Sequence, residues 1–146
     1  MARELEGLET GEHVVASTRA SFRGAAMASS QAMFALGSGR ARQKAYQAWR
    51  VDVEALGFPT AGPEMAILLT ETRLLICRIT FWLGRPTTIE GSIPLARVAG
   101  VGTGRHGLVT VLTVALTNGQ IVDFEAMRGG PLRRFATALG EALPRR

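Results

Sequence analysis

Five residues in this chain are the first candidates for acid–base, nucleophilic or metal chemistry. Neither His13 nor His106 has a second histidine, a cysteine or a carboxylate at metal-ligand spacing. Cys77 stands in an apolar run without a neighbouring base, which is typical of a small buried hydrophobe rather than a nucleophile. Asp123 and Glu125 alternate along a predicted strand and are expected to be exposed, solubilising charges, because paired acid–base work needs two carboxyls with separated pKa values. We therefore expect no enzymatic activity, no metal and no cofactor.

A glycine-rich stretch from Gly102 to Gly107 matches the letters G-x-G-x-x-G of dinucleotide-binding loops. That fingerprint follows a strand and opens a helix, so that the helix N-terminus meets the pyrophosphate. Here the stretch leads instead into the apolar run from Leu108 to Thr117, which predicts a strand. The glycines are therefore expected to form a loop of β-turns and not a dinucleotide site.

The densest basic group in the chain comprises Arg40, Arg42, Lys44 and Arg50, with Trp49 beside them. Arginine makes bidentate contacts to phosphate, and a basic helix with an aromatic residue suits an anionic membrane or a nucleic acid. A solvated helix face is the plainer interpretation of the same charges. No DNA- or RNA-binding module is recognisable, so nucleic acid is not the expected partner.

Two apolar features offer further contact surfaces. Met33 and Phe34 lie in an uncharged stretch from Gly24 to Gly39, whose small residues would allow close helix approach. This stretch suits packing on the core, a self-association surface or membrane contact. Trp82 lies near Arg85 at a turn, where an aromatic and a basic residue together would anchor a partner or simply close the edge of the core.

Length and composition set the class of the protein. The chain has 146 residues, 47% hydrophobic and 20% charged, which predicts one globular domain over residues 1–146. Its net charge is +5, and its one cysteine excludes an internal disulfide. Residues 1–12 are acidic and do not resemble a signal peptide, and no apolar stretch is long enough to span a membrane. We expect a cytoplasmic protein.

The hydrophobic pattern changes from helical to alternating along the chain. Residues 24–56 are rich in helix formers, with a turn expected at 37–39 and a second helix over 41–56. Tyr46, Trp49, Val53 and Leu56 share one face of that helix. A final helix is expected over 130–143, with Pro131 at its first position. Strands are expected at 13–20, 66–70, 73–82, 87–93, 98–103, 108–117 and 120–127.

Finer predictions concern faces and turns. Asn118 and Gly119 predict a type I′ hairpin, because both central residues of that turn need positive φ. Leu75, Cys77, Ile79 and Phe81 are expected to share one face of their strand. Ile89, Gly91 and Ile93 are expected to share one face of the next strand.

The order of these elements resembles the bacterial pleckstrin-homology-like (PH-like) domains, including the GRAM-type members, over about residues 10–143. The resemblance is carried by residues 11–16, 68–75, 93–98 and 112–124, and by the helix led by Pro131. It implies an α+β fold, namely a PH-like seven-stranded antiparallel bent sheet or barrel capped by a C-terminal helix. The stretch 24–56 would then be a helical insertion after the first strand. The resemblance also implies lipid, phosphoinositide or protein binding without enzymatic activity.

We therefore expect a non-enzymatic binding or scaffolding module that mediates protein–protein contacts, including self-association into a homo-oligomer. The alternative is peripheral binding of anionic lipid, at the inner face of the membrane, through the basic helix 40–50. The candidate binding surface consists of Met33, Phe34, Arg40, Arg42, Lys44, Trp49, Arg50, Trp82 and Arg85.

Overall fold

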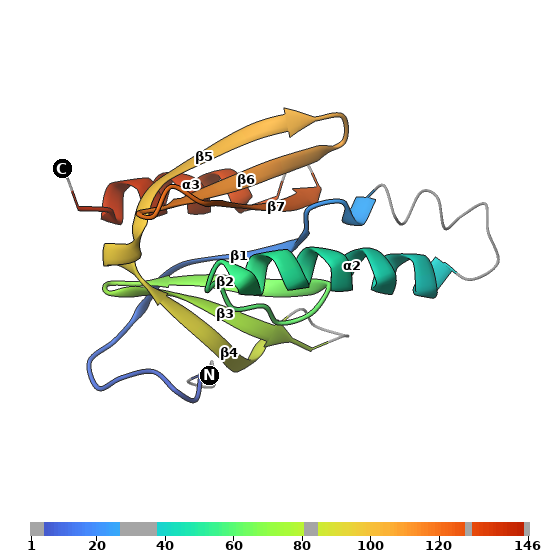
Figure 1. Ribbon diagram of the computed structural model, residues 1–146. Coiled ribbons are helices and arrows are strands. Elements are labelled where there is room, and N and C mark those ends of the chain that lie inside the picture. Colours follow the sequence, from blue (N-terminus) through green and yellow to red (C-terminus); the bar gives the residue numbers. More distant parts are fainter. Residues whose placement is uncertain (1–4, 27–37, 81–84, 128–129, 145–146) are drawn as a thin grey trace.

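The computed structural model describes residues 5–26, 38–80, 85–127 and 130–144. They form an α+β fold with one antiparallel sheet of seven strands (Figure 1). The strands are β1 (Val14–Phe22), β2 (Glu64–Thr70), β3 (Arg73–Ile79), β4 (Pro86–Pro94), β5 (Val98–His106), β6 (Val109–Leu116) and β7 (Ile121–Met127). The helical elements are α2 (Ser38–Ala55), the short 3-10 turn η1 (Leu95–Arg97) and α3 (Leu132–Ala142).

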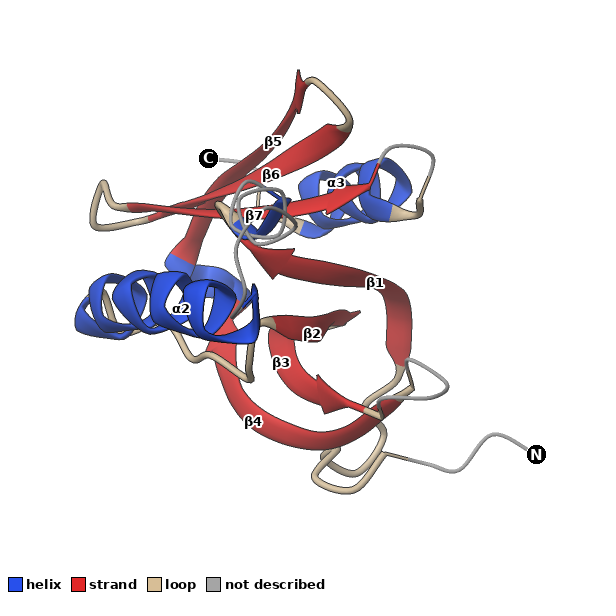
Figure 2. Cartoon of the chain, turned by 90° about the vertical axis from the view of Figure 1, so that its right-hand side faces the viewer, coloured by secondary structure: helices blue, strands red, loops and turns tan. Residues whose placement is uncertain are grey.

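The strand order β4-β3-β2-β1-β7-β6-β5 places β1 at the centre of the sheet and leaves β4 and β5 as its two edges. β1 pairs with β2 over most of its length but with β7 only at Ser21 and Phe22. The two halves of the sheet therefore meet at the end of β1 and diverge elsewhere, which gives the strong bend seen in Figure 2. The bent antiparallel sheet and C-terminal helix are confirmed, but the sheet does not close into a barrel.

The main core fills the space between the two halves of the sheet. Phe58, Leu74, Leu112 and Phe124 are among its members, each at most 1% exposed. α3 contributes the buried stripe predicted for it, with Leu132, Phe135, Ala136 and Leu139 facing inward. The helix starts one residue after Pro131, whose carbonyl accepts the first helical hydrogen bond, from the Phe135 N–H.

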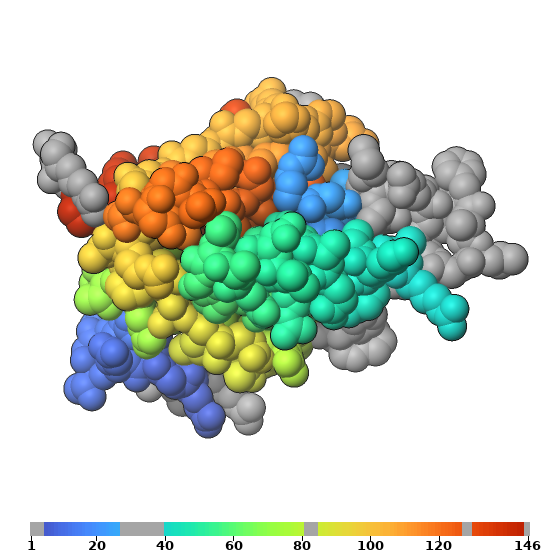
Figure 3. Space-filling model, in the orientation of Figure 1, coloured from blue at the N-terminus to red at the C-terminus, as the bar shows by residue number. Residues whose placement is uncertain are grey.

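α2 lies on the surface between β7 and β4, with one face turned to the core (Figures 2 and 3). Tyr46 and Val53 are buried and Trp49 is half-buried, so the predicted apolar face is confirmed. The helix begins at Ser38, so Ser38 and Gly39 are helical rather than part of the expected turn. The other expected helical segment lies mostly in residues 27–37, outside the described part of the chain.

β2 and β3 are covered on both faces, which the sequence did not predict. Leu75 and Cys77 point away from the main core into a second apolar cluster. Leu5 and Leu8 of the N-terminal segment pack against this cluster. The acidic lead-in therefore covers the outer face of the sheet with its two leucines.

A register shift in β4 changes which of its residues share a face. Ile76 pairs with Gly91 but Cys77 pairs with Ile89, so Glu90 is an extra residue of β4 between the two pairs. Ile93 therefore faces the main core while Ile89 packs on the second cluster, and the expected common face is wrong. A Cβ at Gly91 would lie 2.3 Å from Cβ of Pro59, so glycine is needed there.

The glycine stretch before β6 is a strand and not the expected loop. β5 continues to His106, and the chain turns only at Gly107, where φ is +62°, and Leu108. Without a helix after it, the stretch lacks the geometry of a dinucleotide fingerprint, as the sequence indicated. In β5 the glycines occupy alternate positions of an edge strand.

The hairpin at Asn118 is confirmed, but its turn type is different from the expected one. Gly119 has φ +87°, whereas the φ of Asn118 is not positive. Among the described residues, positive φ values occur at glycines alone. The N–H of Gly119 donates to the carbonyl of Leu116, and the N–H of Gln120 donates to Oδ1 of Asn118. A turn with a single left-handed residue at its end joins β6 to β7, in place of type I′.

Candidate basic binding surface

The antiparallel order of the strands brings separate connections to one end of the molecule. Ile79 pairs with Pro86 and His106 pairs with Val109, so the β3–β4 loop and the β5–β6 turn lie at the same end as the end of β1. α2 and α3 also begin there, on the right in Figure 1. Residues far apart in the sequence are thereby gathered at one end of the sheet.

Basic side chains dominate this end, which we call the basic end. Six of its exposed cations have no ion-pair partner among the described residues. They come from α2, the β3–β4 loop, β5 and the first turn of α3, and they are Arg40, Lys44, Arg85, Arg105, Arg133 and Arg134. Neither helix has an acidic residue in its first turn, so the positive ends of both helix dipoles add to the potential.

The two carboxylates at the basic end are already neutralised. Glu64 accepts hydrogen bonds from Arg19 at 3.3 Å and from Arg42 at 3.2 Å. Glu125 is paired with Arg23 at 2.7 Å. The local surplus of positive charge therefore remains available to an anionic partner.

Glu125 is buried, in contrast to the exposed charge expected from the alternation of β7. Its side chain is 2% exposed and accepts hydrogen bonds from the Arg23 guanidinium and from the backbone N–H groups of Gly24 and Ala26. The chain that leaves β1 folds back over the outer face of β7, and Glu125 caps its first turn. Asp123 is half-buried and accepts a 2.6 Å hydrogen bond from Thr113.

Trp49, predicted as part of the candidate binding surface, is half-buried and takes part in the core packing. Its ring contacts the rings of Phe22, Tyr46 and Phe124, at centroid distances of 6.2, 6.1 and 5.6 Å. Its Nε1 donates to the backbone carbonyl of Asp123 at 3.3 Å. The indole thus joins α2 to β7.

The other predicted surface residues divide into three groups. Arg40, Lys44 and Arg85 are exposed at the basic end. Arg42 is paired with Glu64, and Arg50 is paired with Glu54 at 2.9 Å, so both are partly neutralised. Met33, Phe34 and Trp82 lie outside the described residues.

Arg105, Arg133 and Arg134 were missed by the sequence analysis, although the signal was present. In an antiparallel meander, alternate connections lie at the same end of the sheet. The predicted turns near 84–86 and 104–107 and the start of the last helix are such alternate connections. Their basic residues could have been assigned to one surface from topology alone.

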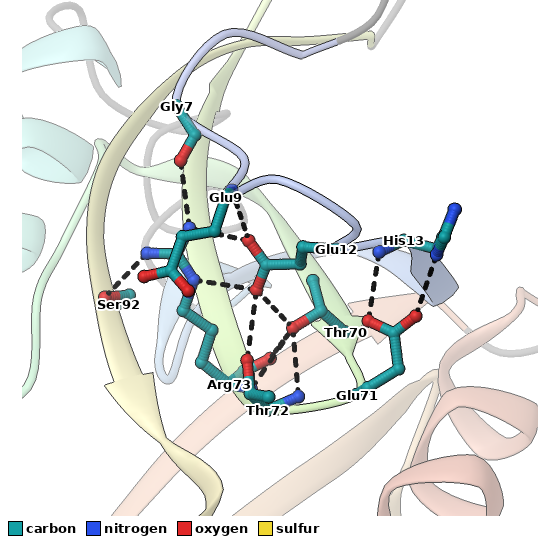
Figure 4. A network of polar contacts seen from close by, with 9 residues as sticks. All are labelled: Gly7, Glu9, Glu12, His13, Thr70, Glu71, Thr72, Arg73 and Ser92. Carbon is teal, nitrogen blue, oxygen red and sulfur yellow. Dashed lines mark hydrogen bonds and ion pairs between the residues drawn. The ribbon is translucent and has the colours of Figure 1, made fainter.

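The opposite end of the sheet carries a polar network around Glu12, shown in Figure 4. Glu12 is bonded to Nε and Nη2 of Arg73 at 2.9 and 2.8 Å, and it accepts a 2.7 Å bond from Thr70. The same guanidinium donates to the carbonyl of Gly7 at 2.9 Å. This bidentate pair fastens the N-terminal segment to the β2–β3 hairpin.

Replacing Glu12 by glutamine is expected to lower the free energy of unfolding by about 1.5 kcal/mol at neutral pH. The hydrogen bonds from Arg73 hold the pKa of Glu12 well below its ordinary 4.5. A lowered pKa stabilises the fold above the unfolded-state value, and this contribution is lost as pH falls through the folded value. In urea unfolding, the difference between wild type and variant should therefore be constant above about pH 5.5 and shrink below about pH 4.5.

Glu6→Gln is the control for this measurement, because Glu6 is an exposed glutamate of the same segment. It should leave the urea midpoint unchanged across the series. A Glu12→Gln variant as stable as wild type at pH 7 would contradict the fastening role of the pair.

A shallow hollow of about 230 Å³ lies next to this network, lined by Glu9, Thr10, Gly11, Glu12, Glu71 and Thr72. Two of its three carboxylates, those of Glu12 and Glu71, are engaged within the chain. Glu12 is bonded to Arg73, and Glu71 contacts the ring Nδ1 of His13 at 3.1 Å. The backbone N–H of His13 also donates to Glu71 and lowers its pKa.

The remaining candidates for chemistry are separated in space. Cys77 is fully buried, and this burial raises the pKa of its thiol to about 11, so it packs as a hydrophobe. His106 is exposed at the end of β5, at the other end of the sheet from His13. Among the described residues there is no group of three or more His, Cys, Asp or Glu placed to hold a metal ion. Likewise, no described helix is both long enough and apolar enough to cross a membrane.

Comparison with known proteins does not supply a family for this chain. No protein-family model matches it, and no curated protein matches it.

Proposed function

We propose that this protein is a non-enzymatic, PH-like binding module that docks on anionic membrane surfaces through its basic end. The observation that supports the proposal is the gathering of six exposed cations at one end of the sheet. They come from four separate parts of the chain and have no ion-pair partner in its described part. Basic residues near an anionic bilayer each contribute about 1 kcal/mol to binding. A cluster of this size is enough for peripheral attachment.

The distribution of the acids supports the same orientation. Glu9, Glu12 and Glu71 lie at the opposite end of the sheet, and Asp52 and Glu54 are in the last turns of α2, away from the basic end. The molecule therefore has a charge asymmetry that would orient it with the basic end toward a negative surface.

An exposed apolar side chain stands beside the cations. Leu108, at the tip of the β5–β6 turn, is 73% exposed and follows Arg105 and His106. An exposed leucine three residues after an arginine suits the boundary between headgroups and acyl chains, where the leucine loses apolar exposure and the arginine meets phosphate. A soluble anionic partner would give Leu108 no such environment.

The PH-like assignment rests on the resemblance and on the architecture. The resemblance implies a bent antiparallel sheet with a helix at one end, and the seven-stranded sheet and α3 are compatible with it. In such a fold, α2 would belong to an insertion between the first two strands. Its N-terminal half then supplies Arg40 and Lys44 to the basic end.

Sedimentation with vesicles tests the proposal. Phosphatidylcholine vesicles containing phosphatidylserine should bind the protein, pure phosphatidylcholine should not, and added salt should weaken binding. Arg85→Glu should weaken binding about tenfold or more, because it removes one cation and adds one anion. Combining Arg40→Gln, Lys44→Gln and Arg85→Gln should reduce it about a hundredfold.

The matched control is Arg97→Glu, which changes the net charge equally but lies in η1 at the opposite end of the sheet. It should bind vesicles like wild type. Equal binding to anionic and neutral vesicles, or equal loss in the Arg97 and Arg85 variants, would refute the proposal. Binding to nucleic acid without binding to vesicles would refute it as well.

A further inference from the structure

The β5 strand presents a free edge whose register with β6 is regular from Gly100 to His106. Val98–His106 pairs with β6 on one side, and its other side pairs with no described residue. In an edge strand every second residue points its N–H and C=O groups outward, where they are able to pair with another chain. The free edge is nine residues long, which is long for an unprotected strand.

The other edge of the sheet is protected. β4 begins with Pro86 and ends with Pro94, and its register with β3 is interrupted twice. Pro59 of the loop after α2 lies against its middle at Gly91. Prolines, irregular register and covering loops are the devices by which proteins block edge pairing. β5 has no proline, and its one register shift is confined to Val98 and Gly100.

We propose that β5 pairs antiparallel with β5 of a second copy of this chain, centred on Gly102. This register overlaps the whole strand. Since the described strands of each copy offer one free edge of this kind, the pairing closes a two-fold dimer and does not continue into a filament.

The side chains of β5 are compatible with this register. On the outer face, Gly102 meets Gly102 of the second copy, and Gly100 meets its Gly104, so nothing projects between the sheets. A Cβ at Gly100 or Gly102 would find no described atom within 4 Å. On the other face, Val101 lies opposite Thr103 of the second copy, which is a favourable cross-strand combination of β-branched residues.

Charge complementarity favours a second copy of this chain as the partner of the free β5 edge. Gly140 of α3 packs on β5, with its Cβ position 3.5 Å from Val101, so the turn of α3 that carries the exposed Glu141 lies beside that part of the strand. Arg105 faces the same side as Val101 and would lie opposite Ala99 of the second copy. Arg105 of each copy thereby approaches Glu141 of the other, and the two Arg105 side chains stay apart.

Such pairing needs no lipid, although Arg105 belongs both to the basic end and to β5. The free edge of β5 exists whether or not the basic end binds a membrane, and in the dimer the two basic ends point in opposite directions. The dimer is therefore tested in solution, without vesicles.

Light scattering after size exclusion should give a particle of twice the 15.6 kDa chain mass at high concentration. Arg105→Glu should weaken the dimer about tenfold through loss of the Arg105–Glu141 pairs, and adding Glu141→Arg should restore it. A monomer at every concentration would overturn the proposal. A dimer indifferent to both changes would overturn it too.

Cysteine cross-linking tests the register. In antiparallel pairs the Cα atoms lie about 4.5–5.5 Å apart, which suits a disulfide, so Gly102→Cys should form a covalent dimer on mild oxidation. Gly100→Cys is the matched control, because two copies of position 100 are separated along the strand by about 13 Å. The buried native Cys77 should not react. Cross-linking at position 100, or none at position 102, would show that the copies meet elsewhere, for example at Met33 and Phe34.

Discussion

Replacing Glu125 by alanine is expected to lower the free energy of unfolding by about 3 kcal/mol, one of the two largest effects we predict. The carboxylate is 2% exposed and is the acceptor for Arg23 and for the N–H groups of Gly24 and Ala26. Without it, two backbone donors at a covered position lose their acceptor. Arg23 has 38% of its side chain exposed, so its guanidinium is able to turn to water, which limits the loss of stability.

Chemical denaturation measures this loss, and amide hydrogen exchange locates it. The Gly24 and Ala26 amides should exchange faster in Glu125→Ala under conditions where the core strands remain protected. Glu125→Gln should recover only part of the stability, since a neutral amide accepts more weakly and its NH₂ would face other donors.

Glu141→Ala is the control, because Glu141 is an exposed glutamate on α3. Measured at a concentration where the chain is monomeric, it should change stability by less than about 0.5 kcal/mol. A Glu125→Ala variant that loses less than about 1 kcal/mol would show that the contact does not hold the segment after β1.

Trp49→Ala should be comparably destabilising, by about 3 kcal/mol, at the lower end of the range for large-to-small changes because the residue is half-buried. The indole touches three aromatic rings, from β1, α2 and β7. It also donates to the Asp123 carbonyl. Its removal would leave a cavity between α2 and the sheet and an unpaired carbonyl.

Trp49→Phe separates packing from ligand binding. This variant keeps most of the aromatic contact and loses the hydrogen bond, so we expect about 1 kcal/mol of destabilisation and unchanged binding to anionic vesicles. Arg50→Ala, the neighbouring residue on the exposed face, is the control for stability. Loss of vesicle binding in a folded Trp49→Phe protein would mean that the indole meets the ligand after all.

Trp49 and Glu125 show why the surface could be only partly predicted. The spacing of Tyr46, Trp49 and Val53 correctly placed Trp49 on the apolar face of its helix, yet a tryptophan among arginines also suits a membrane surface. Alternation along β7 placed Glu125 opposite Phe124, which is correct. Alternation carries no information on whether a distant segment, here Gly24 to Ala26, covers the outer face.

The errors in β4 and β5 have a related origin. A period of two assigns faces only while the pairing is regular, and the shift between Ile76 and Cys77 moved Ile89 to the face opposite Ile93. Glycines at alternate positions indicated a loop by their local conformational freedom. Pairing with β6 nevertheless holds them in a strand up to His106.

By itself, the sequence determined the local structure of this protein: seven strands in order, the amphipathic helices α2 and α3, and the hairpin at Asn118 and Gly119. These features follow from periodicity and turn chemistry, which act between residues close in the chain. Only the tertiary structure decided that the sheet stays open, that Glu125 is buried and that cations from four distant segments share one end. Those outcomes depend on which segments meet across the sheet. Contacts between distant segments do not produce a periodic pattern in the sequence of either segment.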